Sequence, residues 1–310
     1  MSKLTKRIKN WPEYNQSLIR RGSITFWCDE DFLDNWLCFE KSGKRGAPNT
    51  YSDIAITCIL TLKNVYSLSL RAAQGLGESV IRLMGASTRI PNYSTLSRRQ
   101  AGLSIDLAPR ARDIRNIALD STGIKVYGEG EWKVRMHGYS KRRRWLKLHL
   151  AVDTNTHDVV ASIVTDHSMH DSEVVDDLLG QIETPLGQVA ADGAYDTRTT
   201  YDAIQEREGY ASIPPRSGAK IWQHGNSRKK PLQRDENLRG IRQHGRKKWK
   251  KGSGYYRRSL SETAMYRVKQ LFGNKVASRT FSNQCVELYL RCAAMNRMTS
   301  IGMPEYYENP

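Results

Sequence analysis

Three carboxylates lie where they could act together on a phosphodiester. Asp120 ends the apolar run IRNIALD, Asp192 ends the apolar run GQVAAD, and Glu262 lies in a segment with helical spacing. Three such carboxylates can hold two divalent cations about 4 Å apart, one activating the attacking oxygen and the other stabilising the leaving oxygen. Because hard oxygen ligands prefer Mg²⁺ or Mn²⁺ and no Cys or His lies at ligand spacing, a zinc site is disfavoured. Each aspartate alone could also be an ordinary turn former at the end of a strand.

Residues 252–273 have the spacing of one helix with two faces. An apolar stripe for a protein core is formed by Leu260, Ala264, Val268 and Leu271. The opposite face carries Tyr255, Arg258, Glu262, Tyr266 and Lys269. Taken alone, this pattern could be a surface helix whose Arg–Glu pair contributes roughly 0.2–0.5 kcal/mol.

The segment before this helix alternates between strand-like and helix-like patterns. Strands are expected at 114–120, 145–152, 158–164, 187–192 and 210–214, and helices at 171–182 and 198–208. This order predicts an α/β protein with a ribonuclease-H-like mixed sheet flanked by helices, in which the first and fourth strands are adjacent. Asp120 and Asp192 are then expected to be neighbours in space.

Residues 1–110 are predicted to form an α-helical region with a helix-turn-helix. The segment 91–99 places a cap and hydroxyl residues ahead of two adjacent arginines. The first turn of such a helix can meet phosphates or base edges, so Ser94, Arg98 and Arg99 are expected to contact DNA. An ordinary helical bundle is the alternative interpretation.

The charge of the chain indicates a polyanionic partner. Lys and Arg number 49 against 32 Asp and Glu, for a net charge of +17, which favours nucleic acid through counterion release and steering. The densest basic segment is an insertion at 215–254, and a second basic run lies at 141–144. Further DNA contacts are therefore expected at Arg142, Arg143, Lys247 and Lys248. A solvated basic loop is the alternative for the insertion.

The remaining composition argues against a membrane or secreted protein. The five cysteines are odd in number and contain no CxxC pair, which disfavours a disulfide scaffold and a zinc site. No apolar run is long enough to span a bilayer, and the basic N-terminus is not followed by the apolar region of a signal peptide. A reducing cytoplasm is the expected location.

Several motifs resemble those of bacterial insertion-sequence transposases with a DDE site. The spacing Tyr255-x2-Arg258-x3-Glu262-x6-Lys269 reproduces the Y-(2)-R-(3)-E-(6)-K signature of that family. The sequence DGAYD, which begins at Asp192, is similar to the motif around the second aspartate of the family. The segment 91–99 resembles the helix-turn-helix of its insertion-sequence-five group.

The resemblance implies specific roles for these residues. Asp120, Asp192 and Glu262 would be catalytic carboxylates that hold two Mg²⁺ or Mn²⁺ ions, while Tyr255, Arg258 and Lys269 match the other signature positions and would contact DNA. Members of the family use water to expose a 3′-OH at each transposon end and then use that hydroxyl to attack target DNA.

The resemblance also implies how the chain is organised and what it binds. Residues 1–110 would recognise the terminal inverted repeats of double-stranded DNA, and residues 111–310 would be the catalytic domain, with a small basic insertion. Because two ends must be held together, a homo-oligomer, most simply a dimer in a synaptic complex, is expected in the nucleoid-associated cytoplasm of a bacterium.

Two other functions are compatible with the same residues. A ribonuclease-H-like nuclease without strand transfer would keep the three carboxylates but would need neither the helix-turn-helix nor the Tyr255–Lys269 pattern. A DNA-binding regulator with an inactive catalytic domain would bind DNA without cutting it, and the presence of all three carboxylates argues against it.

Overall fold

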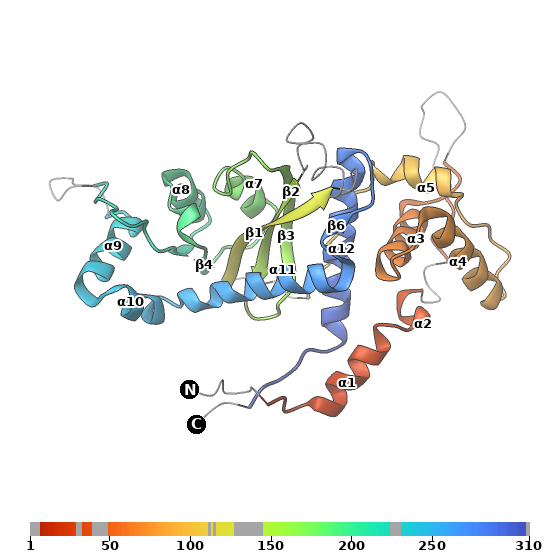
Figure 1. Ribbon diagram of the computed structural model, residues 1–310, viewed down its shortest axis with the longest axis horizontal. Coiled ribbons are helices and arrows are strands. Elements are labelled where there is room, and N and C mark those ends of the chain that lie inside the picture. The colour runs from red at the N-terminus through yellow and green to blue at the C-terminus, as the bar shows by residue number, and fades with distance from the viewer. Residues whose placement is uncertain are drawn as a thin grey trace, which may run out of the picture. The chain divides into compact units, whose positions relative to one another are not determined.

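The computed structural model describes two compact units of the chain (Figure 1). Unit 1 comprises residues 1–106 and 280–310, and unit 2 comprises residues 107–279. Within them, the residues whose structure is described are 7–28, 33–38, 49–110, 113, 116–126, 145–223 and 231–307. Arg142 and Arg143 lie outside these residues.

Unit 1 is α-helical. Its helices are α1 (Trp11–Arg20), α2 (Ile24–Trp27), α3 (Asp53–Val65), α4 (Leu70–Leu83), α5 (Tyr93–Gln100) and α12 (Phe281–Ile301). Polar side chains begin four of them: Ser52 before α3, Ser69 before α4, Asn92 before α5 and Thr280 before α12 each accept a backbone N–H of the first turn. The predicted helical character of the N-terminal region is confirmed.

Buried charges fasten α12 to α3. Glu287 is fully buried and accepts from Arg291 at 2.6 Å, and Lys63 of α3 lies 3.8 Å from the same carboxylate. Arg291 also reaches the side-chain oxygen of Asn64, at 3.4 Å. These contacts explain why residues 280–310 pack with unit 1, whereas the sequence placed them with the catalytic domain at 111–310. The division into DNA-binding and catalytic regions stays a prediction.

None of the helices in the described parts of the chain has by itself the length and apolar composition to cross a membrane. Among these helices, only the pair α3 and α4 has the required length and apolar composition when taken together, and a bend of 112° separates the two.

Unit 2 is built on a six-stranded mixed sheet of order β3-β2-β1-β4-β5, with β6 also paired to β1. The strands are β1 (Asn116–Val126), β2 (Trp145–Asp153), β3 (Val159–Asp166), β4 (Gln188–Ala190), β5 (Tyr210–Ser212) and β6 (Lys275–Val276). The pairs β1–β2 and β2–β3 are antiparallel, whereas β1–β4, β4–β5 and β1–β6 are parallel. The predicted α/β class, a ribonuclease-H-like mixed sheet with the first strand beside the fourth, is confirmed.

Helices cover the sheet and continue into the insertion. They are α7 (Val175–Gly180), α8 (Arg198–Glu206), α9 (Gln233–His244), α10 (Arg246–Gly252) and α11 (Ser259–Phe272), with short 3₁₀ helices η2 (Gly193–Tyr195) and η3 (Tyr255–Arg258). The core against α7 and α8 contains Ile117 and Leu119 of β1. Because side chains alternate along a strand, Asp120 points to the other face. On that face α11 packs against β1 and β2.

Two expected elements differ from those observed. β1 does not end at Asp120 but continues to Val126, because its far half pairs with β2 and β6. The helix expected over 252–273, with Ser253 and Gly254 as its start, does begin after Gly254, but as the 3₁₀ helix η3 that leads into α11 rather than as one α-helix. The break from α10 falls at Gly254, whose left-handed backbone (φ +68°) cannot continue a right-handed helix.

The Gly254→Ala substitution is expected to lower the free energy of unfolding by about 1–3 kcal/mol. An added Cβ would meet the left-handed backbone penalty and would lie 2.8 Å from the amide nitrogen of Gln188, which donates to the Ser253 carbonyl. Urea denaturation of wild type and variant measures the difference. Gly252→Ala is the matched control, because nothing lies within 4 Å of its added Cβ. Equal losses in the two variants would contradict this account of the break.

Candidate active site

The register of β1 and β4 places Asp120 and Asp192 at the same edge. Ala118 of β1 pairs with Ala190 of β4 in parallel. Each aspartate lies two residues beyond its alanine, so both follow the last paired position of the two strands. The predicted proximity of the two carboxylates therefore follows from the strand pairing, although β1 itself continues past Asp120.

A short turn orients Asp192. The carboxylate begins η2 by accepting the Ala194 backbone N–H at 2.8 Å. Tyr195, at the end of η2, is almost fully buried in the core under α7 and α8. The turn is thereby held to the core while Asp192 remains at its start.

Arg258 joins Asp120 to Glu262. One guanidinium nitrogen lies 3.2 Å from Asp120, and another donates to Glu262, which lies four residues later on α11. Arg258 and Asp120 are mostly buried, whereas about half of the Glu262 side chain is exposed. A residue of η3 thus connects the central strand with the helix that carries the third carboxylate.

The charges in this region influence one another. Burial raises the pKa of Asp120 to about 6, while the Ser121 N–H and Arg258 act in the opposite direction. The negative charges of Asp192 and Glu262 add to the rise, which shows that all three carboxylates are within electrostatic reach. Burial disfavours the charged form of Arg258, but Tyr255, Glu262 and Asp120 together raise its pKa.

Tyr255 is held within the protein. Its ring lies 6.3 Å from that of Trp249, with the Lys250 ammonium 4.6 Å and the Arg258 guanidinium 5.9 Å from its centre. Burial raises the pKa of its hydroxyl. These contacts suit a residue that supports Arg258.

The donor chemistry of the three carboxylates fits a divalent cation such as Mg²⁺ or Mn²⁺. In the described part of the chain, no group of three or more His, Cys, Asp or Glu side chains is already closed around a point that could hold an ion. Arg258 lies between two of the three carboxylates and supplies positive charge there. Its ion pairs involve one oxygen of Asp120 and one of Glu262.

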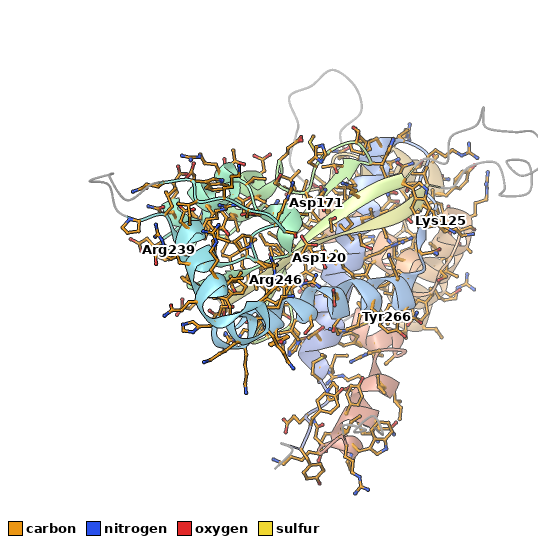
Figure 2. All side chains as sticks on the ribbon, turned by 60° about the vertical axis from the view of Figure 1, so that its left-hand side comes forward. Asp120, Lys125, Asp171, Arg239, Arg246 and Tyr266 are labelled. Carbon is orange, nitrogen blue, oxygen red and sulfur yellow. The ribbon has the colours of Figure 1, made fainter. Side chains whose placement is uncertain are left out.

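A fourth acidic residue lies near this region. Asp171 accepts from Lys147 at 3.1 Å and faces the buried imidazole of His149, whose pKa is lowered to about 4 by burial. The pKa of Tyr195 is raised by burial and then by the charges of Asp171, Asp120 and Asp192, so these three carboxylates are within electrostatic reach of its hydroxyl. Asp120 and Asp171 lie in the same region of unit 2 (Figure 2). The sequence offered Asp171 only as the beginning of a helix.

The paired arginines of the predicted recognition helix α5 have different environments. Arg99 donates to Asp53 at 2.5 Å and to the Tyr51 carbonyl at 3.0 Å, which ties α5 to the start of α3. Arg98 is exposed. The Ser94 hydroxyl donates to Asn92 at 3.0 Å and so takes part in the cap. Of the two arginines, Arg98 is the one placed to reach a partner.

The other residues expected at DNA lie on two helices of unit 2. Lys247 and Lys248 are exposed on α10, and Lys269 is half-buried in the last turn of α11. The insertion at 215–254 is therefore not simply a loop, because it contains the helices α9 and α10.

Two family models match the chain, and both are described as a transposase DDE domain. One matches residues 111–297, which is more than half of the chain and includes Asp120, Asp192 and Glu262. The other matches residues 19–129. No solved structure was found to match the chain. Together the two matches reach from α1 into α12.

In cation-free protein, Asp120→Asn is expected to gain stability relative to wild type as the pH rises. The folded-state pKa of Asp120, about 6, lies above the ordinary value of 3.8. Wild type therefore loses stability as the pH rises between these values, whereas the amide does not titrate. Urea denaturation in EDTA at about pH 5 and about pH 7.5 measures this change. A difference that stays constant with pH would contradict the raised pKa.

Arg99→Ala is expected to affect the stability of the protein, and Arg98→Ala is expected to affect DNA binding. Loss of the Arg99 contacts lowers the free energy of unfolding by about 0.5–1.5 kcal/mol, because the pair with Asp53 is partly exposed. Arg98→Ala leaves stability unchanged but weakens DNA binding and reduces the slope of its salt dependence by about 1. Thermal denaturation and binding titrations at several salt concentrations test both. Unchanged DNA binding by Arg98→Ala would remove α5 as a recognition helix.

Proposed function

Because this chain belongs to the transposase DDE domain family, whose members are metal-dependent DNA-cutting enzymes, we propose that Asp120, Asp192 and Glu262 are its catalytic carboxylates. The observation that supports this proposal best is their convergence from three distant segments, with Arg258 between two of them and Asp192 within electrostatic reach. Carboxylates that repel one another are kept together only where function or compensating charge requires it.

The reaction is phosphoryl transfer by in-line displacement. Water attacks the phosphodiester at each transposon end, and the 3′-OH that this step exposes then attacks target DNA. Asp120, Asp192 and Glu262 hold the divalent cations, which when bound activate the attacking oxygen and stabilise the leaving oxygen. No covalent bond to the protein forms.

Arg258 is suited to two kinds of partner in this cycle. In the protein alone its guanidinium compensates Asp120 and Glu262. The same guanidinium would also be suited to a phosphate of the DNA end, which it would contact through two parallel N–H donors. Tyr255 supports Arg258 from η3. Lys269 offers a positively charged side chain about two turns beyond Glu262 on α11. Together with Glu262, these residues have the spacing of the Y-R-E-K signature, which supports assigning the chain to the group that carries it.

Unit 1 supplies recognition of the DNA ends. Ser94 and Arg98 of α5 meet the terminal inverted repeats, while Lys247 and Lys248 of α10 contact the backbone of the duplex near the cut. Two ends must be held for one strand-transfer event, so the active form is a homo-oligomer, most simply a dimer, on double-stranded DNA.

Glu262→Gln is expected to reduce cleavage of a transposon end at least about a hundredfold, because each carboxylate contributes several kcal/mol of charge stabilisation through the cations. Binding to the same DNA should stay nearly unchanged. The assay uses purified protein, Mg²⁺ and a labelled duplex that carries the end of the element. Asp120→Ala and Asp192→Ala should behave in the same way.

Glu236→Gln is the matched control, because Glu236 is an exposed residue of α9 that pairs with Arg239 away from the three carboxylates. Cleavage retained by Glu262→Gln would remove Glu262 from the site. Nicking without joining to target DNA would indicate a nuclease, and tight binding without cleavage by wild type would indicate a regulator.

A further inference from the structure

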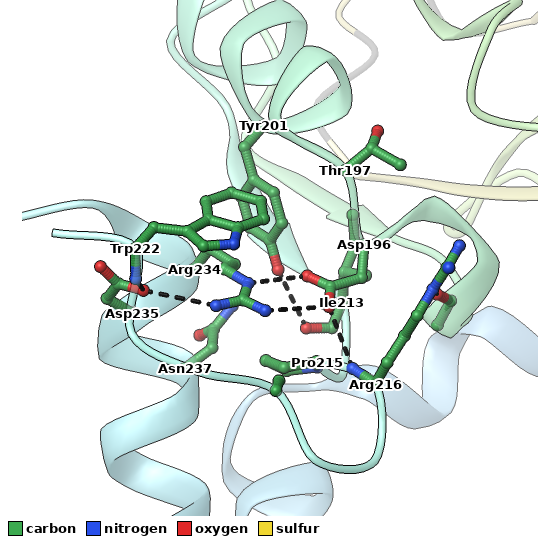
Figure 3. A network of polar contacts seen from close by, with 12 residues as sticks. Asp196, Thr197, Tyr201, Ile213, Pro215, Arg216, Trp222, Arg234, Asp235 and Asn237 are labelled. Atoms are coloured by element: carbon green, nitrogen blue, oxygen red, sulfur yellow. Dashed lines mark hydrogen bonds and ion pairs between the residues drawn. The ribbon is translucent and has the colours of Figure 1, made fainter.

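A buried ionic network links the insertion to the loop after Asp192 (Figure 3). Arg234 of α9 donates to both oxygens of Asp196, at 3.0 and 3.3 Å, and to the Lys220 carbonyl. Its guanidinium lies 4.0 Å from the ring centre of Trp222. On the other side, Asp235 accepts the backbone N–H groups of Trp222 and Gln223, at 2.9 and 2.8 Å.

Burial makes this network costly to break. The side chains of Asp196, Arg234 and Asp235 are 2%, 4% and 1% exposed. Charged groups remain in such surroundings only when they are paired and hydrogen-bonded, and removing one partner leaves an uncompensated buried charge. The segment 216–223 and the start of α9 are therefore fixed to Asp196, four residues after Asp192.

Arg216 connects this network to the turn η2. Its backbone N–H donates to Asp196 at 3.0 Å, so its position depends on the network. Its side chain returns to the turn, where Nε donates to the Gly193 carbonyl at 3.0 Å and Nη2 to the Ala194 carbonyl at 3.2 Å. Ala194 is thus held at its N–H by Asp192 and at its carbonyl by Arg216.

Apart from the buried Tyr195 side chain, the turn has little else to define it. η2 has only three residues, and its backbone hydrogen bonds are long, 3.2 Å from Tyr195 to Asp192 and 3.3 Å from Asp196 to Gly193. Such short 3₁₀ segments are weakly determined by their own hydrogen bonds. The direction of the Asp192 carboxylate then depends on what holds the carbonyls of the two residues that follow it.

We propose that Arg216 is a positioning residue for Asp192, anchored by the Asp196–Arg234–Asp235 network, and that part of the basic insertion serves to aim a cation-binding carboxylate. This inference rests on the proposed function, in which Asp192 is a cation ligand. Supporting residues of this kind usually change metal affinity 10–100-fold when they are removed.

Arg216→Met tests the proposal with Mn²⁺ and the full-length protein in the absence of DNA. Arg216 is exposed, so the variant should fold like wild type, which thermal denaturation checks. Mn²⁺ binding, followed by electron paramagnetic resonance, is expected to weaken about 10–100-fold. Cleavage should need correspondingly more Mn²⁺, and cation-free affinity for end DNA and its salt dependence should stay unchanged. Arg216→Lys, which can still donate to one carbonyl, should recover part of the loss.

Arg242→Met is the matched control, because Arg242 is another exposed arginine of the insertion whose guanidinium donates to a backbone carbonyl, that of Ala219. It should bind Mn²⁺ as wild type does. Wild-type Mn²⁺ affinity in Arg216→Met would overturn the inference alone, as would weaker DNA binding with unchanged Mn²⁺ affinity, which would make Arg216 a DNA contact. Wild-type protein that neither binds Mn²⁺ nor cuts end DNA would overturn the proposed function together with the inference.

Discussion

Repulsion among carboxylates is the constraint on which the structure of unit 2 depends. Parallel pairing of β1 and β4 brings Asp120 beside Asp192, and α11 adds Glu262. Burial of Asp120, with a further contribution from the charges of Asp192 and Glu262, raises its pKa to about 6. Arg258 offsets part of this cost by contacting Asp120 and Glu262 at once. The fold thus maintains a site that is electrostatically unfavourable when empty of cations, as expected where function is retained at some expense of stability.

Each carboxylate is positioned by a different kind of local structure. Asp120 is fixed by strand register, which a whole sheet enforces, and Glu262 by a helix packed across β1 and β2. Asp192 lies on a three-residue turn, which is the least constrained of the three settings. It is also the one that receives outside support, from Arg216 and the buried Asp196–Arg234 pair. The carboxylate with the weakest local structure, Asp192, is thus the one whose neighbouring backbone is held by contacts from the insertion.

The sheet order and the proximity of Asp120 and Asp192 were predictable, because periodicity reports which residues are buried and parallel strands share their ends. Other features were not. The extension of β1 beyond Asp120 depends on pairing with β2 and β6, which residues 120–126 do not encode by themselves. The helix start at Gly254 was expected, but not its left-handed backbone, which a glycine permits but does not require. Packing of α12 with unit 1 depends on a buried pairing of Glu287 with α3, and charge counts do not show which charges are buried.

The same limit applies to the positive charge of the chain. A net charge of +17 suggests a broad surface for DNA. Yet several arginines are engaged with other parts of the protein: Arg99, Arg216, Arg234, Arg258 and Arg291. Because a buried or paired guanidinium neutralises no phosphate, these residues add to the composition but not to counterion release. In the proposed function, affinity for DNA would therefore come from side chains that remain exposed, such as Arg98, Lys247 and Lys248. Arg258 would serve in both ways, since its internal partners are the proposed cation ligands Asp120 and Glu262.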